Sequence, residues 1–190
     1  AAQWSKALAT YARAADLGPI PLWAYFNQAL LAVHLDDQLA FRTACLRLLN
    51  QPDGSPTEIG RLAVRACVLA SRTDPIKAPH AAEIIERVVS LSRRLPPPSD
   101  WERSSLGPAL FRSGAPADSL ATLNREKHVR GWEAYRRIFL ALSLHATGKE
   151  SEAKAEAAFV EKEIEPSRGY YWADRLELEV LLKEVRRVAP

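Results

Sequence analysis

Residues able to support acid–base, metal or nucleophilic chemistry are few in this 190-residue chain. The histidines are His34, His80, His128 and His145, and no two have the i, i+4 spacing with which a helix presents two imidazoles to zinc. No Cys-x-x-Cys pair, Gly-x-Ser-x-Gly turn or Gly-x-Gly-x-x-Gly loop occurs. The "GKES" stretch at 148–151 lacks the upstream glycine of a phosphate loop. We therefore expect neither a metal ion nor a cofactor.

The two cysteines, Cys45 and Cys67, lie in apolar stretches with helical spacing, "FRTACLRLL" and "LAVRACVLA". Two buried free thiols are the simplest interpretation, because free cysteine is among the most buried residue types. They suit a reducing compartment, and we expect the protein in the cytoplasm. Cys67 with His34 is the one candidate nucleophilic pair, and core packing is the favoured role for both. The sequence predicts no enzymatic activity.

The composition is that of an ordinary globular chain, with 47% hydrophobic and 26% charged residues. No run of about 18 apolar residues occurs, so a membrane span is not expected. The net charge of +3 is too small to indicate nucleic-acid binding by itself. The chain contains no methionine, and we expect it to be a piece of a larger protein.

Apolar residues recur at three- and four-residue spacing along nearly the whole chain, which predicts an all-α fold. The sequences "SPTE" and "SDWE", which start at Ser55 and Ser99, match capping boxes and predict helices that begin near 56 and 100. The expected helices, about ten, are 2–17, 21–35, 37–50, 56–71, 79–95, 100–113, 116–128, 131–147, 149–165 and 170–188. Their short connections favour antiparallel pairs.

Small residues and turn glycines recur with a period of 34 residues. The pairs with this separation are Ala29 and Ala63, Gly107 and Ala141, and Gly114 and Gly148. The two capped starts differ by 44 residues (100 − 56), so one unit carries about ten extra residues, which we place near 72–80. A fixed period of 34 indicates stacked helix-turn-helix units.

In this register the chain resembles the tetratricopeptide repeat family. A small residue stands at position 8 of each unit (Ala29, Ala63, Gly107, Ala141), leucine precedes three of them (Leu62, Leu106, Leu140), and Gln28 departs from the pattern. The resemblance implies one solenoid domain over 1–190. It consists of a partial repeat 1–19, repeats 22–53, 56–97, 100–131 and 134–166, and a capping helix 170–188. Position 8 is expected to face the second helix of its unit, which explains Gly107 but not Pro108.

The same resemblance implies that the first helices line a concave groove. The side chains expected there are Trp23, Phe26, Leu30, Trp101, Phe111, Tyr135 and His145. Such an apolar, aromatic groove fits a partner peptide or amphipathic helix. Packing by the chain's own repeats, or by a second copy, is the alternative occupant. The expected function is a non-catalytic protein-interaction scaffold.

The overall texture is also similar to repeat regions attached to bacterial, planctomycete-type serine/threonine kinases and propeller proteins, so the expected context is a larger bacterial signalling protein. The alternative function is nucleic-acid binding by a helical repeat, which is less favoured. It would need dispersed arginines gathered on one face. The arginines in question are Arg61, Arg65, Arg112, Arg136 and Arg137.

Overall fold

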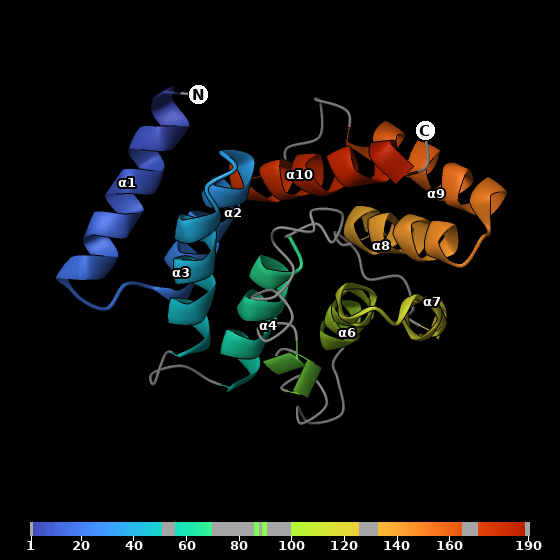
Figure 1. Ribbon diagram of the computed structural model, residues 1–190, viewed down its shortest axis with the longest axis horizontal. Coiled ribbons are helices and arrows are strands. Elements are labelled where there is room, and N and C mark those ends of the chain that lie inside the picture. Colours follow the sequence, from blue (N-terminus) through green and yellow to red (C-terminus); the bar gives the residue numbers. More distant parts are fainter. Residues whose placement is uncertain are drawn as a thin grey trace. The chain divides into compact units, whose positions relative to one another are not determined.

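The computed structural model describes residues 2–50, 56–69, 86–87, 89–90, 100–125, 133–164 and 171–188, without the side chains of 56–61 and 100–105. These residues form nine α-helices and no strand, which confirms the all-α prediction (Figure 1). Most of the predicted helix 79–95 lies outside the described residues, but its residues 86–87 and 89–90 are described and are helical. The insertion at 72–80 and the serines of both capping boxes lie outside the described residues. The helices that follow those boxes begin at Pro56 and Asp100, as expected.

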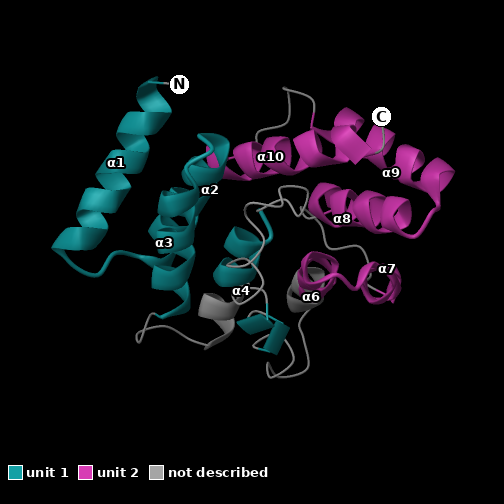
Figure 2. Cartoon of the chain, viewed as in Figure 1, with its two compact units in different colours: residues 1–91 teal, residues 92–190 magenta. Residues whose placement is uncertain are grey.

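The chain divides into two compact units, 1–91 and 92–190 (Figure 2). Unit 1 contains α1 (Ala2–Leu17), α2 (Leu22–His34), α3 (Gln38–Leu49) and α4 (Pro56–Cys67). Unit 2 contains α6 (Asp100–Ser113), α7 (Pro116–Arg125), α8 (Glu133–Ala146), α9 (Glu150–Glu163) and α10 (Trp172–Val188). The single solenoid domain expected over 1–190 stays a prediction.

Each unit is built around one central helix. In unit 1, α2 contacts α1, α3 and α4, and all its residues from Ala24 to Ala32 are buried. In unit 2, α8 contacts α6, α7, α9 and α10, and its residues from Ile138 to Leu144 are buried. A helix that is apolar on all sides is stable only when neighbours surround it, so the hydrophobic sequences of these two helices explain their central places.

One turn recurs between the first and second helix of a pair. Its left-handed residue is Asp36 (φ 60°), Gly114 (φ 93°) or Gly148 (φ 81°). The next residue donates its N–H to the carbonyl five residues earlier, from Asp37 to Ala32, Ala115 to Leu110 and Lys149 to Leu144, at 2.8, 3.0 and 2.9 Å. These bonds satisfy carbonyls at the end of the first helix. The same backbone turn therefore ends the first helix of three pairs, which is consistent with the helical repeat expected from sequence.

The four small residues at position 8 are all buried. A Cβ added to Gly107 would lie 2.5 Å from Leu123 Cγ in α7, the second helix of the same pair. Beside it, Ser119 Oγ donates to the Gly107 carbonyl at 2.7 Å, and Ser143 Oγ donates to Ser119 Oγ at 3.0 Å. The expected contact of Gly107 with the paired helix is confirmed, and α6 continues through Pro108 to Ser113.

Candidate interaction site

The expected groove residues of unit 1 differ in their access to solvent. Trp23, the second residue of α2, is 53% exposed. Phe26 is buried, and the Arg65 guanidinium of α4 lies 4.6 Å from its ring centroid. Leu30 is fully buried. Of these three side chains, only that of Trp23 presents a large apolar surface to a partner.

In unit 2 the expected groove residues contribute mainly to packing. Tyr135 is buried, with its ring centroid 5.2 Å from that of Phe139. Phe111 is partly buried and meets Phe139 edge-on at 6.2 Å. His145 is partly buried near the end of α8. Trp101 belongs to α6, but its side chain lies outside the described part of the chain.

Helix α10 occupies part of the face expected to form the groove in unit 2. It contacts α8 and α9, and its Glu184 accepts two hydrogen bonds from Arg112 of α6, at 2.7 and 2.6 Å. Arg112 directly follows Phe111, and its guanidinium lies 5.4 Å from the Phe139 ring centroid. The chain's own helix α10 therefore packs on the first helix α8 and is tied to the first helix α6 at the residue after Phe111.

Two of the three large apolar side chains that are exposed in the described part of unit 1 lie where α1 ends and α2 begins, and the third is Leu39 of α3. Leu17, the last residue of α1, is 82% exposed, and Trp23 follows after a turn that contains two prolines. α1 and α2 run antiparallel, because Trp4 contacts His34 and Tyr11 accepts a hydrogen bond from Asn27. Arg47, near the end of α3, pairs at 2.6 Å with Asp16, which precedes Leu17. We call Leu17 and Trp23, with this ion pair beside them, the Trp23 end of unit 1.

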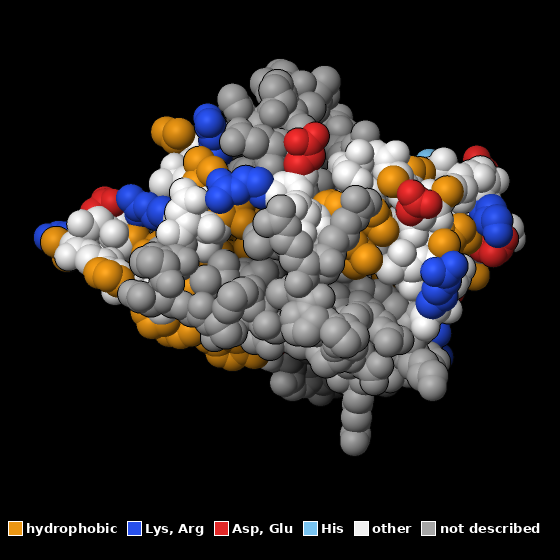
Figure 3. Space-filling view, turned by 90° about the horizontal axis from the view of Figure 1, so that it is seen from below, with side chains coloured by type: hydrophobic (Ala, Val, Ile, Leu, Met, Phe, Trp, Pro, Cys, Tyr) orange, Lys and Arg blue, Asp and Glu red, His pale blue; other side chains and the backbone are white. Residues whose placement is uncertain are grey.

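Four of the five arginines expected for nucleic-acid binding have described side chains, and all four interact with other side chains of the fold. Arg65 is buried over Phe26 and Arg112 is buried against Glu184. Arg136 and Arg137 both bond to Glu133. The side chain of Arg61 lies outside the described residues. On the described part of the face in Figure 3, Lys and Arg side chains are scattered among acidic, apolar and neutral groups. These arginines therefore do not supply the basic face that the alternative function needs.

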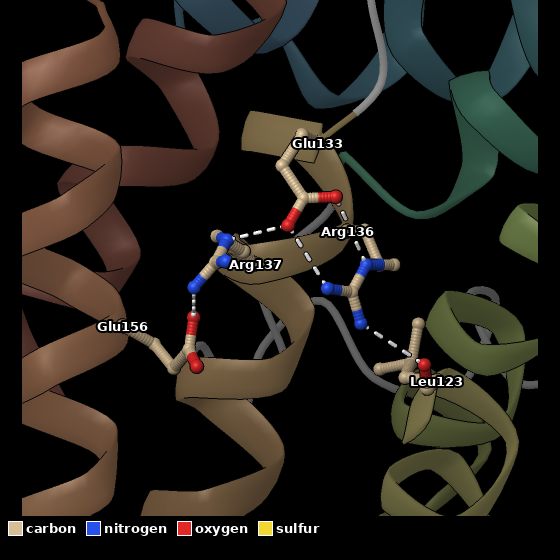
Figure 4. Close-up of polar contacts among 5 residues, drawn as sticks. All are labelled: Leu123, Glu133, Arg136, Arg137 and Glu156. Atoms are coloured by element: carbon tan, nitrogen blue, oxygen red, sulfur yellow. Dashed lines mark hydrogen bonds and ion pairs between the residues drawn. The ribbon is translucent and has the colours of Figure 1, made fainter. Parts of the chain in front are cut away.

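Glu133 is the centre of a polar network that joins three helices (Figure 4). Arg136 also donates to the Leu123 carbonyl of α7 at 3.1 Å, and Arg137 donates to Glu156 of α9 at 2.7 Å. Burial disfavours the charged form of Glu133, but hydrogen bonds and charges from both arginines outweigh it and lower its pKa from 4.5 to about 2. Burial lowers the pKa of Arg137, but hydrogen bonds and charges from Glu133 and Glu156 outweigh it and raise that pKa. The network holds its charges in place and stabilises the α8–α9 pair.

The candidate nucleophilic pair of Cys67 and His34 has other neighbours in the structure. The His34 ring meets the Trp4 ring edge-on at 6.0 Å between centroids. Burial raises the pKa of the Cys67 thiol, and a hydrogen bond and charge repulsion from Cys45 raise it further. A raised pKa keeps the thiol protonated and therefore a poor nucleophile. Among the described residues, no three His, Cys, Asp or Glu side chains are grouped so that they could hold a metal ion.

Comparisons with protein-family models, with functionally characterised proteins and with solved structures give no match. The family resemblance therefore stays a prediction from sequence. Within the described part of the chain, no helix has the length and apolar character needed to cross a membrane.

Sequence reasoning missed two features of the site. It did not identify Leu17 as exposed, although a leucine beside a Gly-Pro turn has few neighbours available to cover it. The expected helices 21–35 and 37–50 place the break at Asp36 correctly, but they do not indicate its equivalence to the turns at Gly114 and Gly148, because aspartate also adopts the left-handed conformation. Asp36 lies seven residues after Ala29, as Gly114 does after Gly107, so the repeat spacing was the available signal.

Proposed function

We propose that this chain is a non-catalytic protein-binding scaffold of tetratricopeptide-like helix pairs within a larger bacterial signalling protein. Its ligand is an apolar segment of a partner protein, such as an amphipathic helix or a peptide with aromatic residues. The Trp23 end of unit 1 is the contact surface. The function class is the one expected from the sequence. Of the expected groove residues, Trp23 is kept as an anchor because it is exposed, and Leu17 is added as a second anchor.

The exposure of Trp23 is the observation that carries the proposal. Tryptophan is among the residues that contribute most to binding at protein interfaces, because its large ring buries much apolar surface and loses little conformational entropy. Here the ring is half exposed at the first turn of a helix that is otherwise buried. Leu17 adds a second large apolar side chain on the other side of the short turn.

The rigidity of the surrounding elements supports the same choice. Trp23 is followed directly by the buried residues Ala24 to Ala32. The backbone of Trp23 is therefore continuous with the central helix of unit 1. The hydrogen bond from Asn27 to Tyr11 links α2 to α1, and the largely exposed Arg47–Asp16 pair adds a weak link from α3. An anchor on a fixed backbone loses little freedom on binding, so more of its contact energy contributes to affinity.

A peptide selection tests the proposal. A displayed library of random peptides would be panned against the purified chain, and selected peptides would be synthesised for titration. We expect apolar or aromatic peptides whose affinity falls about thirtyfold with Trp23→Ala, the loss typical of an interface hot spot. Leu39→Ala is the matched control, because Leu39 is 75% exposed at the start of α3, away from the α1–α2 turn.

Two results would contradict the proposal. One is a selection that yields no binding peptide. The other is a set of peptides whose affinity is the same for wild type, Trp23→Ala and Leu39→Ala. Because both substituted side chains are exposed, we expect the variants to retain the helical circular dichroism and melting temperature of the wild type.

A further inference from the structure

The two cysteines, 22 positions apart in sequence (67 − 45), are neighbours in unit 1. Cys45 lies in α3 and Cys67 is the last residue of α4, and these two helices pack against each other. Both side chains are buried, with 0% and 2% exposure. The Cys45 thiol acts directly on that of Cys67 and raises its pKa, so the two side chains lie beside each other in the core between α3 and α4.

We propose that Cys45 and Cys67 are a disulfide-forming pair, and that oxidation by a low-molecular-weight disulfide links α3 to α4 covalently. In the first step one cysteine thiolate attacks the small disulfide, which forms a mixed disulfide and releases one small thiol. In the second step the other cysteine attacks the cysteine sulfur of the mixed disulfide, and a second small thiol leaves. Two protein thiols are oxidised, and one small disulfide is reduced to two thiols.

The fold favours the product and slows its formation. The reduced chain already holds the two sulfur atoms together, so little additional loop-closure entropy is lost when the bond forms. Burial keeps the Cys67 thiol protonated, and only the thiolate attacks a disulfide. The charge of Arg87 favours the Cys67 thiolate, but its effect is smaller than that of burial. Arg87 is exposed and donates a hydrogen bond to Asn50, the C-cap residue of α3. Reaction therefore requires local opening of the α3–α4 contact, after which the closed unit retains the bond.

Equilibration in glutathione redox buffers tests this proposal. The unmodified chain would be equilibrated at a series of glutathione ratios, in native buffer and in guanidinium chloride, then alkylated and analysed by mass spectrometry of non-reduced peptides. We expect a peptide pair that contains Cys45 linked to Cys67. The equilibrium constant for its formation should be about three-hundredfold larger in native buffer, which corresponds to the loop-closure entropy of a loop of this length.

An equal or smaller constant in native buffer would overturn the proposal, as would a native product consisting only of mixed disulfides or linked dimers. Cys45→Ala and Cys67→Ala are matched controls that can form only mixed disulfides or dimers. If a substitution prevents folding, the native and denatured comparison on the unsubstituted chain still decides the question. Oxidation should also raise the melting temperature by about 7–14 °C. A decrease would contradict the proposal, because it would mean that the bond strains the α3–α4 contact.

Discussion

At the scale of single residues, Gly107 sets how closely α6 and α7 approach. Leu123 is fully buried and already fills the space that a Cβ at position 107 would enter. We predict that Gly107→Leu destabilises the fold by about 2–4 kcal/mol, because the added atoms must push the two helices apart. Denaturant unfolding measures this loss, and Gly18→Leu is the control, since a Cβ at Gly18 would meet nothing within 4 Å.

A double-mutant cycle separates the steric effect from a general effect of losing glycine. In a Leu123→Ala background the space opposite Gly107 is open, so Gly107→Ala should cost nothing or become stabilising through helix propensity. In the wild-type background the same substitution should destabilise. Equal effects in both backgrounds would show that Leu123 is not the residue that excludes a side chain from position 107.

The sequence predicts the burial of a residue when that burial follows from local spacing, and it does not when the burial depends on contacts between helices. The burial of Ala29, Ala63, Gly107 and Ala141 follows from a period that the sequence displays directly. The difference in exposure between Trp23 and the buried Phe26 does not follow from that period. It depends on the contact between helices, in which Arg65 of α4 covers the Phe26 ring. Such cross-helix contacts are not encoded in spacing, and for this reason most residues of the expected groove turned out to be buried or partly buried.

At the scale of helices, the sequence predicted the bounds of most described elements to within a few residues, because caps, turns and apolar spacing act locally. What it could not predict was the role of α10. The amphipathic pattern of 170–188 indicated a cap at the end of a stack, yet Glu177 and Glu184 are both buried. Glu184 reaches α6 rather than only the preceding pair, a contact that depends on tertiary packing across 72 residues of sequence.

The Glu133 network that joins α7, α8 and α9 makes stability depend on pH. The folded-state pKa of Glu133 is about 2, below its ordinary value of 4.5, so its contribution is fully present above pH 4.5 and is lost as pH falls towards 2. We predict that Glu133→Gln removes about 1–2 kcal/mol of unfolding free energy at pH 7, after allowance for solvent screening at this partly exposed site. Urea unfolding at a series of pH values measures the effect.

The difference in unfolding free energy between wild type and Glu133→Gln should decrease steadily as pH falls from 4.5 towards 2. Glu179→Gln is the control, because Glu179 pairs with Arg175 on the exposed side of α10 and such pairs contribute little. If this free-energy difference instead stays constant from neutral pH down to pH 2, the substitution acts by disturbing the packing and not by removing the charge.

At the scale of the whole molecule, the buried pair of Arg112 and Glu184 closes unit 2 by tying its last helix to its first. Their side chains are 1% and 7% exposed, so removal of either leaves a buried charge without its partner. We predict that Arg112→Met costs about 3–5 kcal/mol, and that Arg112→Met with Glu184→Leu recovers most of the loss, because a matched apolar pair avoids the cost of burying charge. Denaturant unfolding of both variants measures these changes.

Hydrogen exchange locates the same effect within the chain. Every contact described for this pair lies in residues 92–190, and unit 1 has a separate central helix in α2. Arg112→Met should therefore accelerate amide exchange in α6, α8 and α10 by local opening while α2 and α3 exchange at the wild-type rate, and the double variant should restore protection. If α2 and α3 accelerate by the same factor, the two units open together and the pair stabilises the chain as a single cooperative body. Acceleration confined to α10 would instead mean that this helix detaches without opening the rest of unit 2, and that the face it covers on α6 and α8 is stable without it.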